Sequence, residues 1–329
     1  MLTAAIIGLG QAGSRFDEEP RPVTWSHAGA YLAAADRYRL IGGADIKTGN
    51  RDRFIARCPD VPVFAQGAEM VAEVKPDVIS VCTPPVGRAD LVEGLLAAHR
   101  PKVLICEKPL EVEDDRRHQL VDACATARVP LLVNYSRRYT TVYRKVREAL
   151  AAGRLGKITS ITVIAPNRLW SVGSHAVNLL LYLACEVPDR WRALPLPALE
   201  EDGEPACDLL CRFPSGVAGR VLTTGFREML VFEVDIVGRE GRVRIHGNGA
   251  TATFNAFTDS PQYLGYRVLG QDEVLHQTAD GESTFETLVR EAADLAEDRG
   301  SPSSTGDEAL VSEEILGALA AQCATGEAA

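Results

Sequence analysis

The chain lacks three features that would assign it to a membrane, an export route or a nucleic acid. Its apolar runs are much shorter than the ~20 residues that a transmembrane helix requires. Met1-Leu2-Thr3 carries none of the basic residues that open a secretory signal. Lys and Arg number 35 against 45 Asp and Glu, and a formal net charge of −10 disfavours binding to polyanions. We therefore expect a cytoplasmic protein whose partner is a small molecule, and neither a membrane nor a nucleic acid.

Cysteine is present, but it is not organised into a ligand set. The 8 cysteines are scattered along 329 residues, and no C-x-x-C pair occurs. Cys207 and Cys211 share an expected strand, but a metal site would need further ligands beside them, and none appear. The pattern favours buried, reduced thiols in a cytosolic protein without a metal.

The pattern of apolar segments changes near residue 135. Before it, short buried strands alternate with helices, which is typical of a parallel, doubly wound sheet with right-handed crossovers. After it, longer alternating runs and turn residues predict hairpins, such as 206–213 with 217–223. We predict an α/β protein with a Rossmann dinucleotide-binding domain over 1–134. A substrate-binding and oligomerisation domain over 135–329 would contain an open, mainly antiparallel sheet, and the last helices could pack back toward the first domain.

A glycine motif follows the first expected strand. Residues 4–7 are apolar, and Gly8-Leu9-Gly10-Gln11-Ala12-Gly13 gives G-x-G-x-x-G directly after them. Here the first glycine allows a tight turn, the second lets the backbone approach a pyrophosphate, and the third lets a helix pack against the strand. The candidate cofactor-binding residues of this turn are Gly8, Gly10, Gln11 and Ala12.

Asp45 ends the second expected strand. A carboxylate there can accept hydrogen bonds from the adenosine ribose and would repel a 2′-phosphate, which favours NAD over NADP. Lys47 and Arg51 lie nearby and offset part of that charge, so NADP stays open. Asp45 is further from the glycines than the usual spacing of about twenty residues, and a polar loop at 17–25 accounts for the excess.

Two more expected strands end in residues that can do chemistry. Thr83-Pro84-Pro85 follows the strand at 77–82, and Glu107-Lys108-Pro109 follows the strand at 102–106. Parallel strands end at a common edge, where open α/β sheets bind ligands. Thr83, Pro84, Glu107 and Lys108 are therefore expected beside the cofactor. A lysine at that edge can protonate, deprotonate or orient a substrate oxygen.

Taken together, these motifs resemble the Gfo/Idh/MocA oxidoreductases, which include inositol dehydrogenase and glucose–fructose oxidoreductase. The resemblance includes Gly173-Ser174-His175 at the start of an apolar helix and covers almost the whole chain. It implies a Rossmann domain, a second domain whose open sheet often forms an oligomer interface, and catalysis in the cleft between the domains. It also implies Lys108 and His175 as catalytic residues.

The chain departs from the family motif that reads roughly D-x-G-x-H-x-x-D. Ser171 and Asn178 stand at the two acidic positions around His175. Neither residue can hold a negative charge, so we expect His175 to be mainly neutral at pH 7 and Lys108 to carry most of the proton transfer. Arg88 stands where many relatives have a histidine. It either meets an anionic group of the substrate or cofactor, or is a surface residue at a helix start.

Further candidates flank the expected cleft, and a structural role is as consistent with each as substrate contact. Trp25-Ser26-His27 on the inserted loop could cover the adenine side. The predicted substrate-binding residues are Tyr135, Arg138, Asn167, Arg168, Trp170, Ser171 and Asn178.

These residues predict an NAD(P)-dependent oxidoreductase. The nicotinamide would exchange a hydride with a carbon bearing a hydroxyl, carbonyl or imine, in a substrate that family analogy makes a sugar, a cyclitol or a similar polar molecule. Two alternatives stay open: an enzyme that uses NAD transiently for elimination or glycoside cleavage, and a non-catalytic dinucleotide-binding regulator. The lost carboxylates favour the regulator, whereas Lys108 and His175 disfavour it. We expect a homodimer or tetramer formed through the C-terminal sheet.

Overall fold

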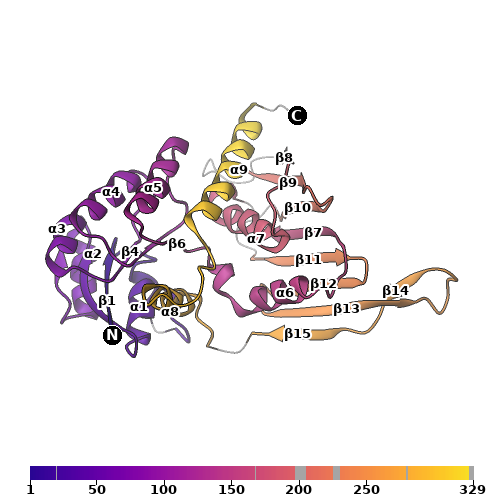
Figure 1. The fold of residues 1–329 in the computed structure, drawn as a ribbon, viewed down its shortest axis with the longest axis horizontal. Helices are drawn as coiled ribbons and strands as arrows, with labels where there is room; N and C mark the ends of the chain where they lie inside the picture. Colours follow the sequence, from indigo (N-terminus) through magenta and orange to yellow (C-terminus); the bar gives the residue numbers. More distant parts are fainter. Residues whose placement is uncertain (20, 167, 197–204, 225–229, 279–280, 326–329) are drawn as a thin grey trace. The chain divides into compact units, whose positions relative to one another are not determined.

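The chain forms two compact units in the computed structural model (Figure 1). One unit consists of Met1–Tyr139 with Gly281–Leu310, and the other of Thr140–Asp280 with Val311–Ala329. The structure describes residues 1–19, 21–166, 168–196, 205–224, 230–278 and 281–325.

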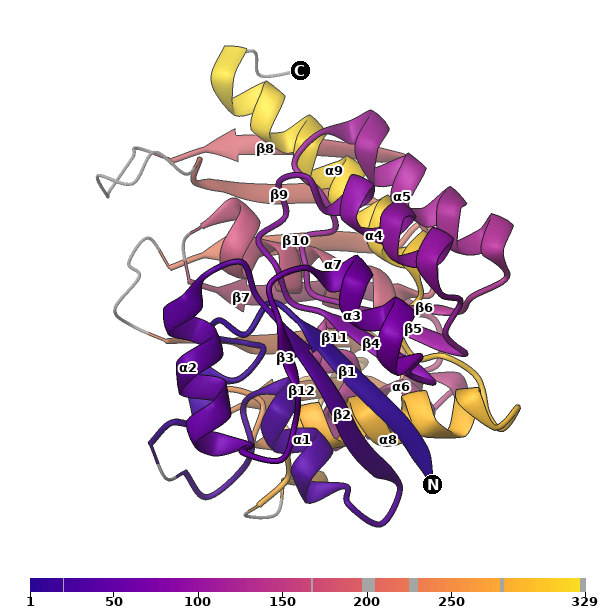
Figure 2. The same cartoon turned by 90° about the vertical axis from the view of Figure 1, so that its left-hand side faces the viewer.

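The first unit contains a parallel sheet with the strand order β3-β2-β1-β4-β5-β6 (Figure 2). The strand order changes direction at β1 and β4, which is the arrangement of a Rossmann fold and confirms the predicted doubly wound sheet. The strands are β1 (Leu2–Ile7), β2 (Tyr38–Ala44), β3 (Val63–Phe64), β4 (Val78–Val81), β5 (Val103–Cys106) and β6 (Leu131–Val133). The helices that follow them are α1 (His27–Ala33), α2 (Thr48–Arg57), α3 (Gly67–Val74), α4 (Arg88–Ala98) and α5 (Asp114–Ala127).

Helices cover both faces of this sheet because its strands are apolar on both sides. Ile79 of β4 packs into a core with residues of α3, α4 and α5. Its neighbour Val78 points to the opposite face, into a core with residues of α1 and α8 (Thr284–Ala296). The Tyr38 hydroxyl donates a hydrogen bond to the Val289 carbonyl of α8 at 2.8 Å. A helix close to the end of the chain is thus part of the first unit.

Residues 14–26 form an insertion between the glycine turn and α1. The insertion contains a short 3-10 turn, and Asp17 in it accepts a hydrogen bond from the Ser26 hydroxyl. Ser26 also caps α1 by accepting the N–H of Gly29 at 3.1 Å. The helix begins on the glycine turn itself, since the His27 N–H donates to the Ala12 carbonyl at 2.9 Å. The insertion therefore adds sequence length without moving α1 away from the turn.

The second unit contains a sheet with the order β14-β13-β12-β11-β7-β10-β9-β8, and β15 pairs with β13. Its neighbouring strands run antiparallel except β7 and β10, which confirms the predicted mainly antiparallel sheet. The strands are β7 (Ile158–Ala165), β8 (Arg190–Pro195), β9 (Cys207–Arg212), β10 (Ala218–Thr223), β11 (Glu233–Gly238), β12 (Gly241–His246), β13 (Thr251–Asp259), β14 (Arg267–Leu269) and β15 (Glu273–Gln277). The helices are α6 (Thr141–Ala151), α7 (Ser174–Ala184) and α9 (Gly306–Thr325), which starts in the first unit.

One face of the second sheet carries the core of this unit. Alternate residues of β7, such as Ile161 and Val163, are buried with side chains of α6, α7 and α9. The residues between them, Thr162 and Ile164, are only half-buried and lie on the opposite face. The alternation therefore distinguishes the covered face of this sheet from its more exposed face.

Candidate dinucleotide site and catalytic residues

A cavity of about 620 Å³ lies at the carboxyl edge of the Rossmann sheet, within the first unit. Its volume is in the range of small-molecule and cofactor sites. The turn after β1 and the ends of β2, β4 and β5 all contribute to its lining. The structure brings together every residue predicted to bind the cofactor: Gly8, Gly10, Gln11, Ala12, Asp45, Thr83, Pro84, Glu107 and Lys108.

Each of the three glycines in the turn has a different structural reason to lack a side chain. Gly8 has φ +88°, and a Cβ there would lie 2.7 Å from the Cys82 carbonyl carbon of the neighbouring strand. A Cβ on Gly13 would lie 1.9 Å from the Gly8 carbonyl oxygen, so only glycine lets the turn close. A Cβ on Gly10 would meet nothing described within 4 Å, and Gly10 lines the cavity. The backbone is therefore bare on the side where a phosphate group would approach.

Asp45 is fixed at the end of β2 by three hydrogen bonds. Its Oδ2 accepts the Leu9 N–H and the Asn50 side-chain amide, each at 2.8 Å, and its Oδ1 accepts the Lys47 N–H at 2.8 Å. A carboxylate has about four lone-pair positions, so about one remains for a ribose hydroxyl. The negative charge stays in the cavity wall, where it disfavours a 2′-phosphate.

Glu107 belongs to a buried cluster that connects three segments of the first unit. Its Oε1 accepts a hydrogen bond from the Asn134 side-chain amide at 2.7 Å and lies 3.1 Å from His27 Nε2. His27 is fully buried, with its ring edge-on to Phe285 at 5.3 Å between ring centroids. His27 therefore does not cover the adenine side from a surface loop, which is a correction to the sequence-based suggestion.

The Glu107 cluster keeps the carboxylate ionised. Burial alone raises the pKa of a carboxyl group. Here the hydrogen bond and charge of His27, the hydrogen bond from Asn134 and the charge of Lys108 outweigh burial, and the pKa of Glu107 is lowered. The side chain of Glu107 remains 15% exposed and lines the cavity, so this charge faces the site.

Arg88 is not a surface residue, and its guanidinium is engaged by backbone carbonyls. It is 1% exposed, and Nη2 donates to the Thr83 carbonyl. Nη1 donates to the carbonyls of Glu107, Pro109 and Leu110. Within the described residues, no carboxylate pairs with this guanidinium. Arg88 therefore fastens the loop after β4 to the loop after β5, on both sides of Lys108.

The second unit holds His175 and most of the predicted substrate-binding residues. Arg168 precedes a π-helical turn, Leu169–Gly173, that contains Trp170 and Ser171, and His175 is the second residue of α7. These four predicted side chains are half-buried. Asn167 lies outside the described residues.

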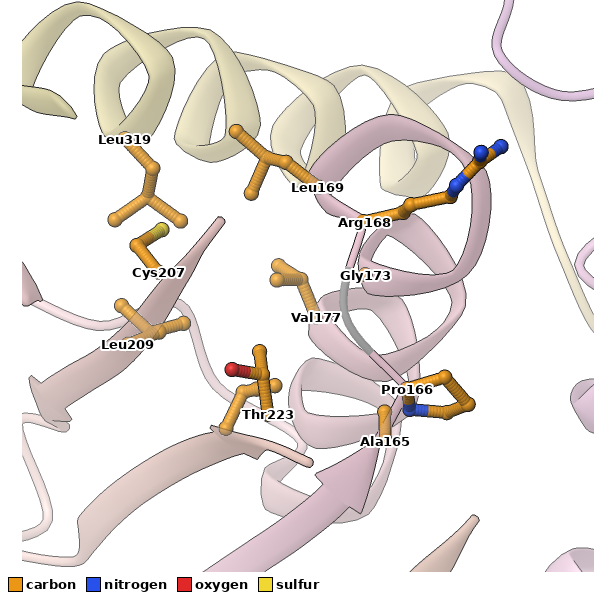
Figure 3. Close-up of a pocket in the computed structure, with 11 residues that line it drawn as sticks. Ala165, Pro166, Arg168, Leu169, Gly173, Val177, Cys207, Leu209, Thr223 and Leu319 are labelled. Atoms are coloured by element: carbon orange, nitrogen blue, oxygen red, sulfur yellow. The ribbon is translucent and has the colours of Figure 1, made fainter. Parts of the chain in front are cut away.

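A small apolar cavity lies beside this turn (Figure 3). Its volume is about 10 Å³, which is close to the space of one water, so it cannot hold a sugar. Leu169, Cys207 and Leu319 line it, while the guanidinium of Arg168 points away from them in Figure 3. This cavity is a packing defect of the core and adds no substrate site.

Three predicted substrate-binding residues have structural contacts. Tyr135 is 1% exposed in the Rossmann core. Arg138 is 2% exposed, with Nη1 2.7 Å from a carboxylate oxygen of Glu308. Asn178 is 1% exposed and donates a hydrogen bond to the Ser312 hydroxyl at 2.9 Å. These contacts favour packing roles for Tyr135, Arg138 and Asn178.

Other chemistries find little support in the described residues. No group of three or more His, Cys, Asp or Glu side chains there could hold a metal ion. The cysteines form no disulfides, and burial raises the pKa of Cys124 to about 12 and of Cys211 to about 11, so these thiols are not activated. A search of the described helices found none with the length and apolar content that crossing a membrane requires.

The parallel sheet and its cavity define a Rossmann-type dinucleotide-binding protein. Residues 2–135 match the GFO_IDH_MocA family, described as "Oxidoreductase family, NAD-binding Rossmann fold". This match to an oxidoreductase family agrees with the resemblance and supports a nicotinamide dinucleotide as the cofactor.

Curated relatives and solved structures agree with this assignment. The chain is 30% identical to an inositol 2-dehydrogenase of Rhizobium meliloti over 26% of each protein. It is 24% identical to the myo-inositol dehydrogenase Hyg17 of Streptomyces leeuwenhoekii over 80% of the chain and 82% of that protein. The WlbA dehydrogenase of Bordetella pertussis, solved with NADH and UDP-GlcNAcA, has the same fold, with a TM-score of 0.76 at 18% identity over 99% of this chain and 97% of that one.

Proposed function

We propose that this protein is an NAD-dependent dehydrogenase or reductase that acts on a hydroxyl- or carbonyl-bearing carbon of a sugar or cyclitol. The observation that carries the proposal is the single cavity that joins the glycine turn, Asp45 and Lys108. Relatives named for inositol, a glucoside and anhydrofructose support the class of substrate. The chain's own specificity for NAD over NADP rests on the Asp45 charge.

In the proposed mechanism, Lys108 transfers a proton and His175 forms a hydrogen bond. The residues that line the cavity would hold the nicotinamide dinucleotide, which would supply the hydride-transfer chemistry. Lys108 Nζ donates a proton to the substrate oxygen during reduction and removes it during oxidation. We propose His175 as a further catalytic residue that acts as a hydrogen-bonding group, because Ser171 and Asn178 carry no negative charge at the two acidic positions of the family motif. We also propose a cytoplasmic location and a homo-oligomer formed through the second sheet.

Binding and product analysis test the proposal together. Calorimetry with NAD and NADP should show tighter binding of NAD. Incubation of the protein with NAD⁺ and a panel of cyclitols and sugars should then yield NADH and one oxidised product in equal amounts. A changed substrate without net NADH would favour transient redox in an elimination or glycoside cleavage. Tight NAD binding without any turnover would favour a regulator.

A further inference from the structure

We propose that Glu107 makes this site bind oxidised NAD⁺ more tightly than reduced NADH. The proposal rests on the proposed function, because it requires the nicotinamide at the Lys108 end of the cavity. It concerns the balance between the two forms of the cofactor.

The position of Glu107 in the sheet supports this role. In the order β2-β1-β4-β5, Asp45 ends β2, the glycine turn follows β1, and Glu107 ends β5. A dinucleotide with its adenosine at Asp45 and its pyrophosphate at the turn extends toward β4 and β5. The nicotinamide end is therefore the part of the cofactor nearest Glu107.

The charge difference between the two cofactor forms lies in the nicotinamide ring. The ring carries one positive charge in NAD⁺ and none in NADH. A fixed carboxylate beside it attracts the oxidised form only, and this attraction is strong where water is largely excluded. Glu107 is the carboxylate in this position, and its side chain is shielded except toward the cavity.

The contacts of His27 and Asn134 with Glu107 allow its negative charge to be removed while its hydrogen bonds are kept. Both contact the same oxygen, Oε1. His27 Nε2 is the donor to an ionised carboxylate, and its Nδ1 is buried with no hydrogen-bond partner among the described residues.

The same geometry makes Glu107→Gln a clean test. The glutamine carbonyl can take the place of Oε1 and accept both hydrogen bonds, while its NH₂ group replaces Oε2. The substitution therefore removes the charge and keeps both contacts. Glu107→Asp keeps the charge, and Glu93→Gln removes a charge from the exposed side of α4, away from the cavity.

The experiment measures dissociation constants for NAD⁺ and NADH by calorimetry on the full chain, with thermal melting as a check on folding. In Glu107→Gln we expect NAD⁺ binding to weaken about tenfold relative to NADH. Glu107→Asp should change the ratio of the two constants by less than about threefold, and Glu93→Gln should leave it unchanged.

Two outcomes separate this inference from the proposed function. If Glu107→Gln is folded, binds both forms and keeps the wild-type ratio, the inference is wrong while the function stands. If Glu107→Gln does not fold, two other results contradict the inference. One is a wild-type protein that binds NADH more tightly than NAD⁺. The other is a Glu107→Asp variant in which NAD⁺ binding weakens tenfold or more relative to NADH binding. If the wild-type protein binds neither form, the proposed function itself fails.

Discussion

One buried guanidinium holds the backbone on both sides of Lys108. Arg88 donates to the carbonyls of Glu107 and Pro109, the two residues that flank Lys108. The sequence placed Lys108 correctly at the edge of the sheet because a parallel strand must end there. The sequence did not reveal the role of Arg88, because its partners are four backbone carbonyls, and every type of residue has a backbone carbonyl.

The Arg88 contacts predict a destabilised and slower enzyme in Arg88→Met. Four carbonyl groups lose their donor inside the protein, which should lower the free energy of unfolding by about 2–4 kcal/mol. Lys108 should lose its fixed position, so kcat should fall by more than the affinity for NAD. Urea unfolding and steady-state kinetics measure both effects.

Arg100→Met is the matched control, because Arg100 is exposed just after α4. Its stability should stay within about 0.5 kcal/mol of the wild type. Wild-type stability and kcat in Arg88→Met would show that the carbonyl contacts do not hold the loop of Lys108.

At the scale of elements, sequence pattern predicted strands and helices well where burial is strong. The hairpin of β11 and β12 has the strong alternation that marks one buried face. β8 and β15 are not evident from the sequence, because Arg190–Pro195 contains one buried residue and Glu273–Gln277 contains none, so neither segment alternates clearly. The His27–Glu107 contact was missed too, since it joins residues 80 positions apart through tertiary packing.

The junction of the 3-10 turn Ser136–Tyr139 with the start of α9 predicts a pH-dependent stability. Burial raises the pKa of Glu308, but the hydrogen bond and charge of Arg138 lower it below its usual value of 4.5. The carboxylate therefore stabilises the fold above the unfolded pKa, and this contribution is lost as the pH falls through the folded one.

Urea unfolding at pH 7 and at pH 3.5 tests this contribution. Because Glu308 is 43% exposed, solvent screening limits its contribution to about 1 kcal/mol. Glu308→Gln should lose that amount at pH 7 and little at pH 3.5. An equal loss at both values would mean that the ion pair does not produce the pH dependence.

At the scale of the whole molecule, the two sheets differ in how far helices cover their faces, and this difference predicts different functions for the two units. The first sheet is covered by helices on both faces, and its large cavity lies at the carboxyl edge. The second sheet has one covered face, and its other face carries half-exposed apolar residues such as Ile164 and Leu222, which are register partners on β7 and β10. That difference predicts ligand binding in one unit and self-association through the other.

Ile164→Glu tests self-association. The wild type should sediment as a dimer or tetramer, and a charge on the open sheet face should shift it toward monomer without unfolding it. Leu32→Glu, at a 47% exposed site on α1, is the control and should keep the wild-type mass. A monomeric wild type, or an unchanged mass in Ile164→Glu, would contradict the proposed interface.

The most direct test of Lys108 as the acid–base residue compares the wild type with Lys108→Ala. The measurement is the rate of NADH formation from NAD⁺ and the best cyclitol or sugar substrate. The variant should bind NAD⁺ with nearly wild-type affinity, because the glycine turn and Asp45 are intact. Its kcat should fall by ~10²–10⁴, since the group that moves the proton of the substrate oxygen is gone. Wild-type turnover in Lys108→Ala would contradict the assignment of Lys108 as the acid–base residue of this cavity.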